Sequence, residues 1–304
     1  MKTTPGNTRE GGDATRTPNI WLLGMRPRTL TMAAVPVAVG AALAWAQGVN
    51  PDWLTFVVTL ACAVLIQIGT NLFNDARDGE RGADGPDRIG PVRITGAGLA
   101  QPKQVRRAAV GCFAAALLAG IYLIVVGGVP ILLIGLASLV AGYAYSSGPR
   151  PLSHGPFSEV YVIVFFGLIA VAGSYYLQAK TLPGIAVLLT GIAIGSYAAA
   201  VLLVNNLRDT AADLKAGRRT LAGRLGTRGS RWLYGFLLLA PFPLLAGAWG
   251  VQALGLVWLA VPVCLWAIVL FAGMPVGPRM NAQLGRTAMI QVLVGGLLIV
   301  ELLT

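Results

Sequence analysis

Long apolar runs, separated by short polar breaks, follow one another along almost the whole chain. A helix needs about 20 mostly apolar residues to cross the hydrocarbon core of a membrane. Nine runs approach or reach this length: 29–47, 53–73, 106–126, 129–146, 160–178, 183–205, 232–249, 254–272 and 284–303. Several breaks contain turn residues, as in Gly127-Gly128-Val129-Pro130. The pattern therefore predicts an all-α, polytopic membrane protein, built as a bundle of nine transmembrane helices.

Polar residues are concentrated at the N-terminus and in three longer connections. These connections are 74–105, 147–159 and 206–231. The first 18 residues are polar, rich in Gly, Thr and Pro, and lack the apolar stretch of a cleaved signal peptide. We expect residues 1–18 to form a disordered cytoplasmic tail and residues 19–304 to form a single transmembrane domain.

The composition agrees with this pattern and excludes several other classes of protein. Hydrophobic residues make up 56% of the chain and charged residues 12%, whereas soluble globular proteins have roughly 45–50% and 25%. The three cysteines are odd in number, and none has the C-x-x-C spacing of a zinc or redox motif. An ordinary soluble enzyme, a disordered protein and a disulfide-rich scaffold are therefore excluded.

The placement of the basic residues predicts the orientation of the bundle. The formal net charge is +11, and of the 23 Lys and Arg residues only Lys180 falls in the loops of one side. Because basic residues accumulate on the cytoplasmic side, the N-terminus is expected in the cytoplasm and the C-terminus outside. The basic excess then reflects topology and contact with anionic lipid headgroups, and no nucleic-acid partner is expected.

Asn and Asp residues form two clusters, one at the end of the second apolar run and one at the end of the sixth. Spacings of three or four residues place side chains on one face of a helix. The first cluster is Asn71, Asn74, Asp75 and Asp78, and the second is Asn206, Asp209 and Asp213. Both clusters are expected at the same membrane surface, because each ends a run that crosses in the same direction.

Two such clusters suit a magnesium ion and a phosphate-bearing substrate. Mg²⁺ takes oxygen ligands and commonly bridges one or two carboxylates to substrate phosphates. Basic residues follow each cluster and can neutralise the remaining phosphate charge. The clusters therefore predict a site for an amphiphile with a diphosphate head and a hydrocarbon tail. The alternative is that the acids only cap helix ends, but two matching clusters at one surface favour the metal site.

Longer segments around the clusters carry a resemblance to a known family. Asn74-Asp75-x-x-Asp78 and Asp209-x-x-x-Asp213 stand out, as do Arg26-Pro27-Arg28-Thr29-Leu30, Gln67-Ile68-Gly69-Thr70-Asn71 and Val204-Asn205-Asn206-Leu207-Arg208-Asp209. With these motifs the chain resembles the UbiA-type intramembrane prenyltransferases over roughly residues 20–303. Members of that superfamily carry Asp-rich motifs on the second and sixth of nine helices. Within it, the resemblance is strongest to the enzymes that prenylate 1,4-dihydroxy-2-naphthoate in menaquinone synthesis.

The resemblance implies a reaction, a place in the cell and a set of site residues. It implies transfer of a polyprenyl group from polyprenyl diphosphate to the aromatic acid in the bacterial inner membrane, with loss of CO₂ and pyrophosphate. The implied catalytic residues are Asp75, Asp78, Asp209 and Asp213, and the implied Mg²⁺ ligands are these four with Asn71, Asn74 and Asn206. The implied substrate-binding residues are Arg26, Arg28, Arg88, Arg150, Lys215, Arg218, Asn205 and Tyr145. The prenyl tail is expected to face lipid through a lateral opening lined by Phe165, Phe166 and Tyr197.

One departure from the family pattern keeps the acceptor open. Related enzymes often have a Lys where this chain has Pro149, so we expect Arg150 to take over its contact. Another aromatic acceptor, such as 4-hydroxybenzoate, therefore remains an alternative. A secondary transporter is disfavoured, because transporters place ionisable residues near the bilayer midplane and none of the acids here falls in mid-run.

Overall fold

The computed structural model describes residues 19–80, 89–146 and 151–304, and within these ranges it contains helices and no strands. The helices near the N-terminal half are α1 (Ile20–Met25), α2 (Pro27–Trp45), α3 (Trp53–Glu80), α4 (Pro102–Ser146), the short η1 (Leu152–His154), α5 (Ser158–Ile163), η2 (Val164–Ile169) and α6 (Ala170–Ala179). They are followed by α7 (Ile185–Arg208), α8 (Thr210–Lys215), α9 (Leu221–Leu239), α10 (Pro241–Trp249), η3 (Gln252–Leu254), η4 (Val257–Ala260), α11 (Val261–Gly273) and α12 (Met280–Leu303). The predicted tail, residues 1–18, lies outside the described residues.

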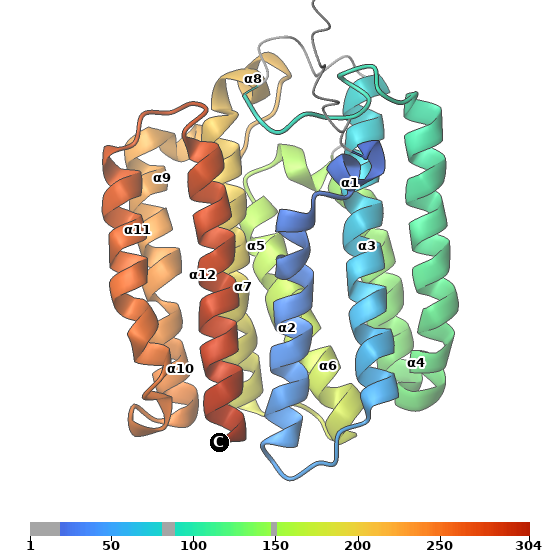
Figure 1. The fold of residues 1–304 in the computed structure, drawn as a ribbon, viewed down its shortest axis with the longest axis vertical. Helices are drawn as coiled ribbons and strands as arrows, with labels where there is room; N and C mark the ends of the chain where they lie inside the picture. Colours follow the sequence, from blue (N-terminus) through green and yellow to red (C-terminus); the bar gives the residue numbers. More distant parts are fainter. Residues whose placement is uncertain (1–18, 81–88, 147–150) are drawn as a thin grey trace, which may run out of the picture.

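Most of these helices stand side by side in one bundle (Figure 1). Among the described residues, seven helices are long and apolar enough to cross a membrane, and an eighth apolar helix, Val257–Gly273, is shorter. The prediction of nine separate transmembrane helices is therefore not confirmed as it stands. The difference lies in that short helix and in α4, where two predicted runs form one unusually long element.

The long element α4 reverses its direction halfway along. Gly128 has φ 66° and ψ −153°, which breaks the helix and which glycine adopts without the cost of a Cβ. A Cβ placed on Gly142 would lie 3.6 Å from the ring of Phe113. In a straight helix these two residues would be about 43 Å apart. The α4 element is thus a helical hairpin whose two legs match the predicted runs 106–126 and 129–146.

The helix α7 lies at the centre of the bundle. It contacts α5, η2, α9, α10 and α12, and Ile194, Tyr197 and Ala198 on it are fully buried. Gly167 on η2 faces Gly191 and Gly195 of α7, and a Cβ on Gly167 would come within 2.3 Å of the Gly191 carbonyl oxygen. Such small residues allow membrane helices to approach closely. The fifth predicted run is therefore held directly against α7.

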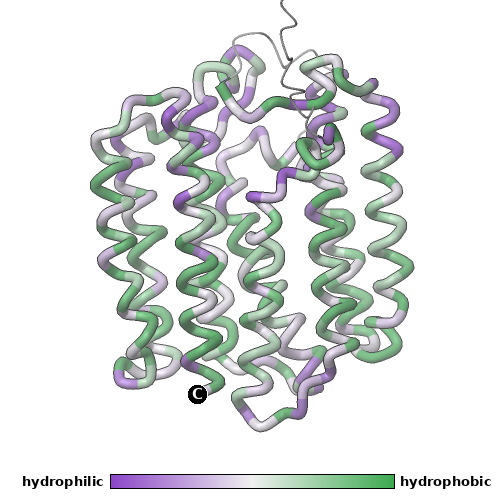
Figure 2. The backbone as a smooth tube through the Cα atoms, viewed as in Figure 1, coloured by the Kyte–Doolittle hydropathy of each residue, from purple (hydrophilic) through white to green (hydrophobic). Residues whose placement is uncertain are grey.

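The two ends of the bundle differ in polarity. Figure 2 shows hydrophilic segments gathered at the end that carries α1, α8 and the beginning of α4, whereas the middle of most helices is hydrophobic. Asp78 on α3 and Asp213 on α8 both belong to this end, which we call the polar end. The bundle therefore presents an apolar flank of the kind a bilayer covers, and it gathers charge at one surface.

Candidate active site

A large cavity enters the bundle at the polar end, and its walls change from polar to apolar with depth. Its volume is about 890 Å³, and helices α2 to α8 contribute to its lining. On α3 the lining residues extend from Asp78 to Thr59, a rise of about 28 Å along the helix. Charged and amide side chains line the polar end, and Leu123, Ile131 and Leu177 line the deep end. The cavity therefore has the shape and polarity expected for an amphiphile with a charged head.

The two predicted clusters meet at the mouth of this cavity. Nη2 of Arg218 lies 2.7 Å from Oδ1 of Asp78, which belongs to the first cluster. Nη1 of the same arginine lies 3.6 Å from Oδ1 of Asp213, which belongs to the second. The other carboxylate oxygen of Asp78 pairs with Arg93. Residues about 140 positions apart in the chain are thus joined through one guanidinium group.

A buried arginine that sequence reasoning did not select organises the second cluster. Arg208 is 2% exposed, and its Nε and Nη2 donate to both carboxylate oxygens of Asp209 at 2.8 and 2.6 Å. It also donates to Oδ1 of Asn205 at 2.7 Å and to Oδ1 of Asn281 at 2.6 Å. The bidentate pair fixes the orientation of the Asp209 carboxylate. The only signal in the sequence was the position of Arg208 directly before an aspartate of the motif.

The structure places Asp75 differently from its predicted role. Asp75 is 1% exposed, and its two carboxylate oxygens accept hydrogen bonds from the backbone N–H groups of Ile94 and Thr95, both at 3.0 Å. Asn74 and Asp78 line the cavity, whereas Asp75 is absent from the lining. Asp75 therefore anchors the connection that follows α3. Asp75 directly follows Asn74, so its side chain lies about 100° around the helix from that of Asn74 and faces this connection. The expectation that Asp75 shares the cavity face is therefore wrong.

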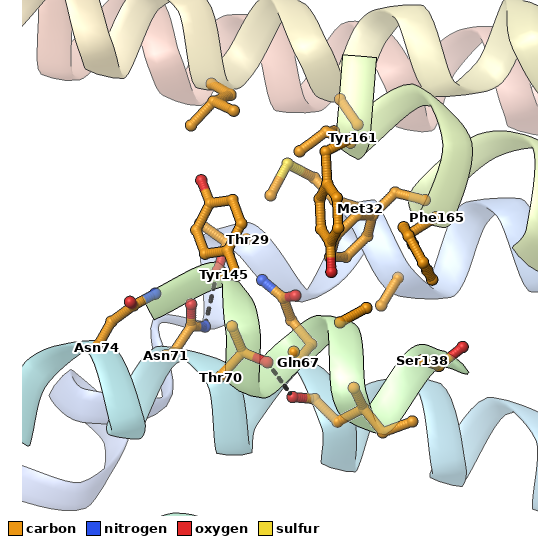
Figure 3. A pocket seen from close by; sticks show the side chains of 18 of the residues that line it. Thr29, Met32, Gln67, Thr70, Asn71, Asn74, Ser138, Tyr145, Tyr161 and Phe165 are labelled. Carbon is orange, nitrogen blue, oxygen red and sulfur yellow. Dashed lines mark hydrogen bonds between the residues drawn. The ribbon is translucent and has the colours of Figure 1, made fainter. Parts of the chain in front are cut away.

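The cluster asparagines line the cavity while their amide nitrogens hold neighbouring elements. Nδ2 of Asn71 donates to the carbonyl of Met25 at 3.0 Å and to Oγ1 of Thr29 at 3.1 Å, as Figure 3 shows in part. Nδ2 of Asn206 donates to Oε1 of the buried Glu159 at 2.9 Å. Through these hydrogen bonds the two asparagine side chains hold α1, α2 and α5 around the mouth of the cavity.

The predicted substrate-binding residues fall into three groups. Those that line the cavity are Arg26, Lys215, Arg218, Asn205 and Tyr145. Arg28 is exposed and absent from the lining, so its predicted contact with substrate is not supported. Arg88 and Arg150 lie outside the described residues. Arg93 and His154, which were not predicted to bind substrate, also line the cavity.

Of the three residues predicted to line the opening for the prenyl tail, two line the cavity. Phe165 and Phe166, on η2, line the cavity. Tyr197 is fully buried in the core around α7 and is absent from the lining, so its predicted place is wrong. The sequence alone does not reveal which neighbours an aromatic residue in a hydrophobic run contacts, because the packing of the other helices determines those contacts.

Burial alters the acidity of one carboxyl group at the mouth. Desolvation raises the pKa of Asp213 to about 6, and the nearby Asp209 and Asp78 carboxylates act in the same direction. The guanidinium groups of Arg218 and Arg208 oppose this shift by favouring the charged form. A divalent cation bound among these carboxylates would therefore reduce their mutual repulsion.

The carboxylates are spread around the mouth, not gathered into a closed metal cage. Within the described ranges, no group of three or more His, Cys, Asp and Glu side chains is close enough to hold a metal ion by itself. Mg²⁺ usually binds through one or two carboxylates together with waters and substrate phosphates. The carboxylates of Asp78, Asp209 and Asp213, which are paired with arginines here, fit that mode of binding, in which the substrate completes the site.

Comparison with known proteins gives one family and one fold. The model of the UbiA prenyltransferase family matches residues 33–290. The chain is 40% identical over 219 residues to a 1,4-dihydroxy-2-naphthoate octaprenyltransferase of Mycobacterium tuberculosis, covering 72% of this chain and 74% of the relative. A protein of the same name from Escherichia coli is 39% identical, covering 74% and 75%, and one from Mycobacterium leprae is 35% identical, covering 90% and 92%.

Solved structures share the fold at much lower sequence identity. A UbiA homolog from Archaeoglobus fulgidus bound to GPP and Mg²⁺ superimposes with a TM-score of 0.67 at 15% identity, covering 94% of this chain and 100% of that one. An apo UbiA homolog from Aeropyrum pernix K1 gives the same TM-score at 15% identity, covering 89% and 97%. At this identity the likeness concerns the fold alone.

Proposed function

The chain belongs to the UbiA prenyltransferase family, and from this premise we propose that it transfers a polyprenyl group from polyprenyl diphosphate to 1,4-dihydroxy-2-naphthoate. It is a multi-pass membrane protein and a prenyltransferase. The reaction would release pyrophosphate and CO₂ and give the hydroquinone demethylmenaquinol, the reduced form of demethylmenaquinone, for menaquinone biosynthesis. Relatives that are 35–40% identical over most of the chain bear the name of this activity with an octaprenyl donor, which supports the acceptor.

The observation that carries this proposal is the bridge from Asp78 through Arg218 to Asp213 at the head of a long apolar cavity. Cationic and anionic groups that alternate at this point can bind a diphosphate together with its counter-cation. The apolar depth behind them can take a hydrocarbon tail. A water-soluble substrate would leave that depth unfilled, so the cavity as a whole favours a prenyl diphosphate.

The chain's own oxygen donors fit a magnesium ion. Asp78, Asp213 and Asp209 would hold it, with Asn74 beside them. The UbiA homolog from Archaeoglobus fulgidus binds Mg²⁺ together with GPP or DMAPP. When bound, the metal would act as a Lewis acid that takes up charge on the leaving pyrophosphate. Arg218 and Arg93 already pair with Asp78, so they would turn toward phosphate oxygens when the substrate arrives.

The remaining residues would orient the two substrates and exclude water. Lys215 and Arg218 line the cavity and would bind the diphosphate oxygens. Arg26, directly before α2, also lines the cavity and would attract the carboxylate of the acceptor. The apolar walls below would shield the allylic cation from water, which otherwise would capture it. Attack by the electron-rich ring at the carbon that carries the carboxylate then allows CO₂ to leave.

The fold supports a specific membrane topology for this reaction. We infer nine crossings, of which the two legs of α4 supply two and the short apolar helix Val257–Gly273 supplies one. The polar end would face the cytoplasm, because 22 of the 23 basic residues fall in segments assigned to that side. The two clusters would then end the second and sixth crossings at the cytoplasmic face of the inner membrane.

The acceptor assay tests this function directly. Membranes that contain the protein are given Mg²⁺ and octaprenyl diphosphate, with 1,4-dihydroxy-2-naphthoate or 4-hydroxybenzoate in separate reactions. We expect pyrophosphate release and a decarboxylated, prenylated naphthalene product, identified by mass, only with the first acceptor. A prenylated benzoate alone would transfer the function to the alternative acceptor, and absence of product with either would contradict aromatic prenylation.

A further inference from the structure

Gln67 is a buried polar residue in the middle of the cavity wall. It lines the cavity from α3 and is only 5% exposed. Its Oε1 is buried and has no hydrogen-bond partner within the part of the chain that the structure describes. Buried polar atoms in native proteins are almost always hydrogen-bonded, and one left unpaired is costly. An unpaired buried acceptor in the wall of a cavity therefore points to a bound molecule that supplies a donor.

The position of Gln67 along α3 relates it to the diphosphate end. Gln67, Asn71, Asn74 and Asp78 lie at helical spacing on one face, and all four line the cavity. Gln67 lies about 6 Å below Asn71 and about 16 Å below Asp78 along the helix axis. A group bound at Gln67 would therefore lie beside the first part of the prenyl chain, where the reacting carbon follows the diphosphate.

An aromatic row faces the same part of the cavity. The ring centroids of Tyr145 and Tyr161 are 5.7 Å apart, and those of Tyr161 and Phe165 are 4.5 Å apart. All three residues line the cavity, and Figure 3 shows the Gln67 amide directed toward Tyr145 and Tyr161. Aromatic rings pack favourably against one another at such distances. We call Tyr145, Tyr161 and Phe165 the aromatic row.

Only one of the two substrates can satisfy Gln67. The prenyl tail is a hydrocarbon without donors, and a fully ionised diphosphate carries acceptor oxygens only. A hydroxylated aromatic ring supplies both an O–H donor and a flat apolar face. We propose that Gln67 and the aromatic row form the acceptor subsite, in which Oε1 of Gln67 accepts a hydrogen bond from a ring hydroxyl and the ring packs against the row. This inference rests on the proposed prenyl transfer to a hydroxylated aromatic acid.

The chain offers a matched pair of variants. Gln67→Met keeps the length of the side chain and removes the amide. Gln291 on α12 is fully buried, and its Oε1 is also without a partner among the described residues, but it is absent from the cavity lining. Gln291→Met is therefore the control for loss of a buried amide elsewhere in the bundle. Kinetic constants are measured for each substrate separately with purified protein in detergent and Mg²⁺.

We expect Gln67→Met to raise the KM for 1,4-dihydroxy-2-naphthoate about 10-fold, since one hydrogen bond is lost. The KM for octaprenyl diphosphate should change by less than about twofold, which also shows that the variant is folded. Gln291→Met should leave the KM for the acceptor unchanged. Equal changes in both KM values for Gln67→Met, or no change in either, would overturn the acceptor subsite.

Inhibition by acceptor analogues isolates the hydrogen bond itself. Inhibition constants of 2-naphthoate, 1-hydroxy-2-naphthoate and 4-hydroxy-2-naphthoate are compared against the dihydroxy substrate. In the unmodified protein at least one hydroxylated analogue should bind several-fold tighter than 2-naphthoate, and Gln67→Met should abolish that difference. A difference that persists in Gln67→Met would refute the proposed bond. If the unmodified protein does not prenylate the naphthoate at all, the proposed function fails instead, so the two failures are distinguishable.

Discussion

Arg218 provides the sharpest test of how the two clusters bind substrate. Its Nη2 donates a hydrogen bond to Oδ1 of Asp78 at 2.7 Å, and its Nη1 lies 3.6 Å from Oδ1 of Asp213. Arg218 therefore pairs with carboxylates that a magnesium ion would need. The substitution Arg218→Gln removes the charge but keeps a polar side chain. We expect two opposite effects, because Arg218 assists the diphosphate and competes with the metal.

The magnitudes follow from the contacts of the side chain. A hydrogen bond between charged groups contributes about 1.5–3 kcal/mol, so kcat/KM for polyprenyl diphosphate should fall about 10- to 150-fold. The competing pair with Asp78 is lost at the same time, while Asp78 keeps its pair with Arg93. The Mg²⁺ concentration for half-maximal activity should therefore fall, by about threefold to 10-fold if roughly half of that interaction is recovered.

The assay varies Mg²⁺ and polyprenyl diphosphate independently and measures prenylated product. Arg219→Gln is the matched control, because Arg219 is the neighbouring residue, is exposed and does not line the cavity. It should leave both constants near those of the unmodified protein. An increase in both the Mg²⁺ requirement and the KM for the diphosphate in Arg218→Gln would refute the competition with the metal, since loss of a purely structural role would weaken the binding of both.

Three further predictions concern the same end of the bundle. Asp78→Asn should abolish turnover in a folded protein, whereas Asp75→Asn should lower thermal stability and retain Mg²⁺-dependent activity in the folded fraction; loss of all activity in folded Asp75→Asn protein would contradict this assignment. Because the pKa of Asp213 is raised to about 6, its carboxyl group is protonated below that pH, so the Mg²⁺ requirement should increase as pH falls from 7 to 5; an unchanged requirement would exclude Asp213 as a ligand. Arg208→Met should destabilise the protein by about 3–5 kcal/mol, because it leaves the Asp209 carboxylate without its buried partner, and an unchanged melting temperature would argue against the buried pair.

The raised pKa of Asp213 also makes the stability of the protein depend on pH and on Mg²⁺. A carboxyl group whose pKa is raised on folding, as for Asp213, contributes stability that is complete below its unfolded pKa and is lost as the pH rises through about 6. Mg²⁺ binding would offset that loss near neutral pH. Added Mg²⁺ should therefore stabilise the protein more at pH 7 than at pH 5, which a thermal shift series with and without the metal would measure.

Local patterns in the sequence predicted most of the helices and several of the polar residues that line the mouth of the cavity. Apolar runs of membrane length depend only on successive residues, so they located the helices, including the reversal at Gly128. The spacing of Asn71, Asn74 and Asp78 also depends on a single helix, and these residues do share the cavity face. Convergence of the two clusters was a hypothesis from the motifs, and the bridge through Arg218 now joins them.

Tertiary structure alone decided what each side chain faces. Asp75 and Asp78 are both aspartates of one motif, yet the connection after α3 takes the first and leaves the second to the cavity. Arg208 is an ordinary arginine in the sequence, and only packing between α7 and α12 buries it against Asn281. Gln67 acquires its unpaired oxygen in the same way, from the helices around it. Sequence periodicity determines the face on which a residue lies, but partners come from segments far away in the chain, so only the packed bundle determines which faces meet.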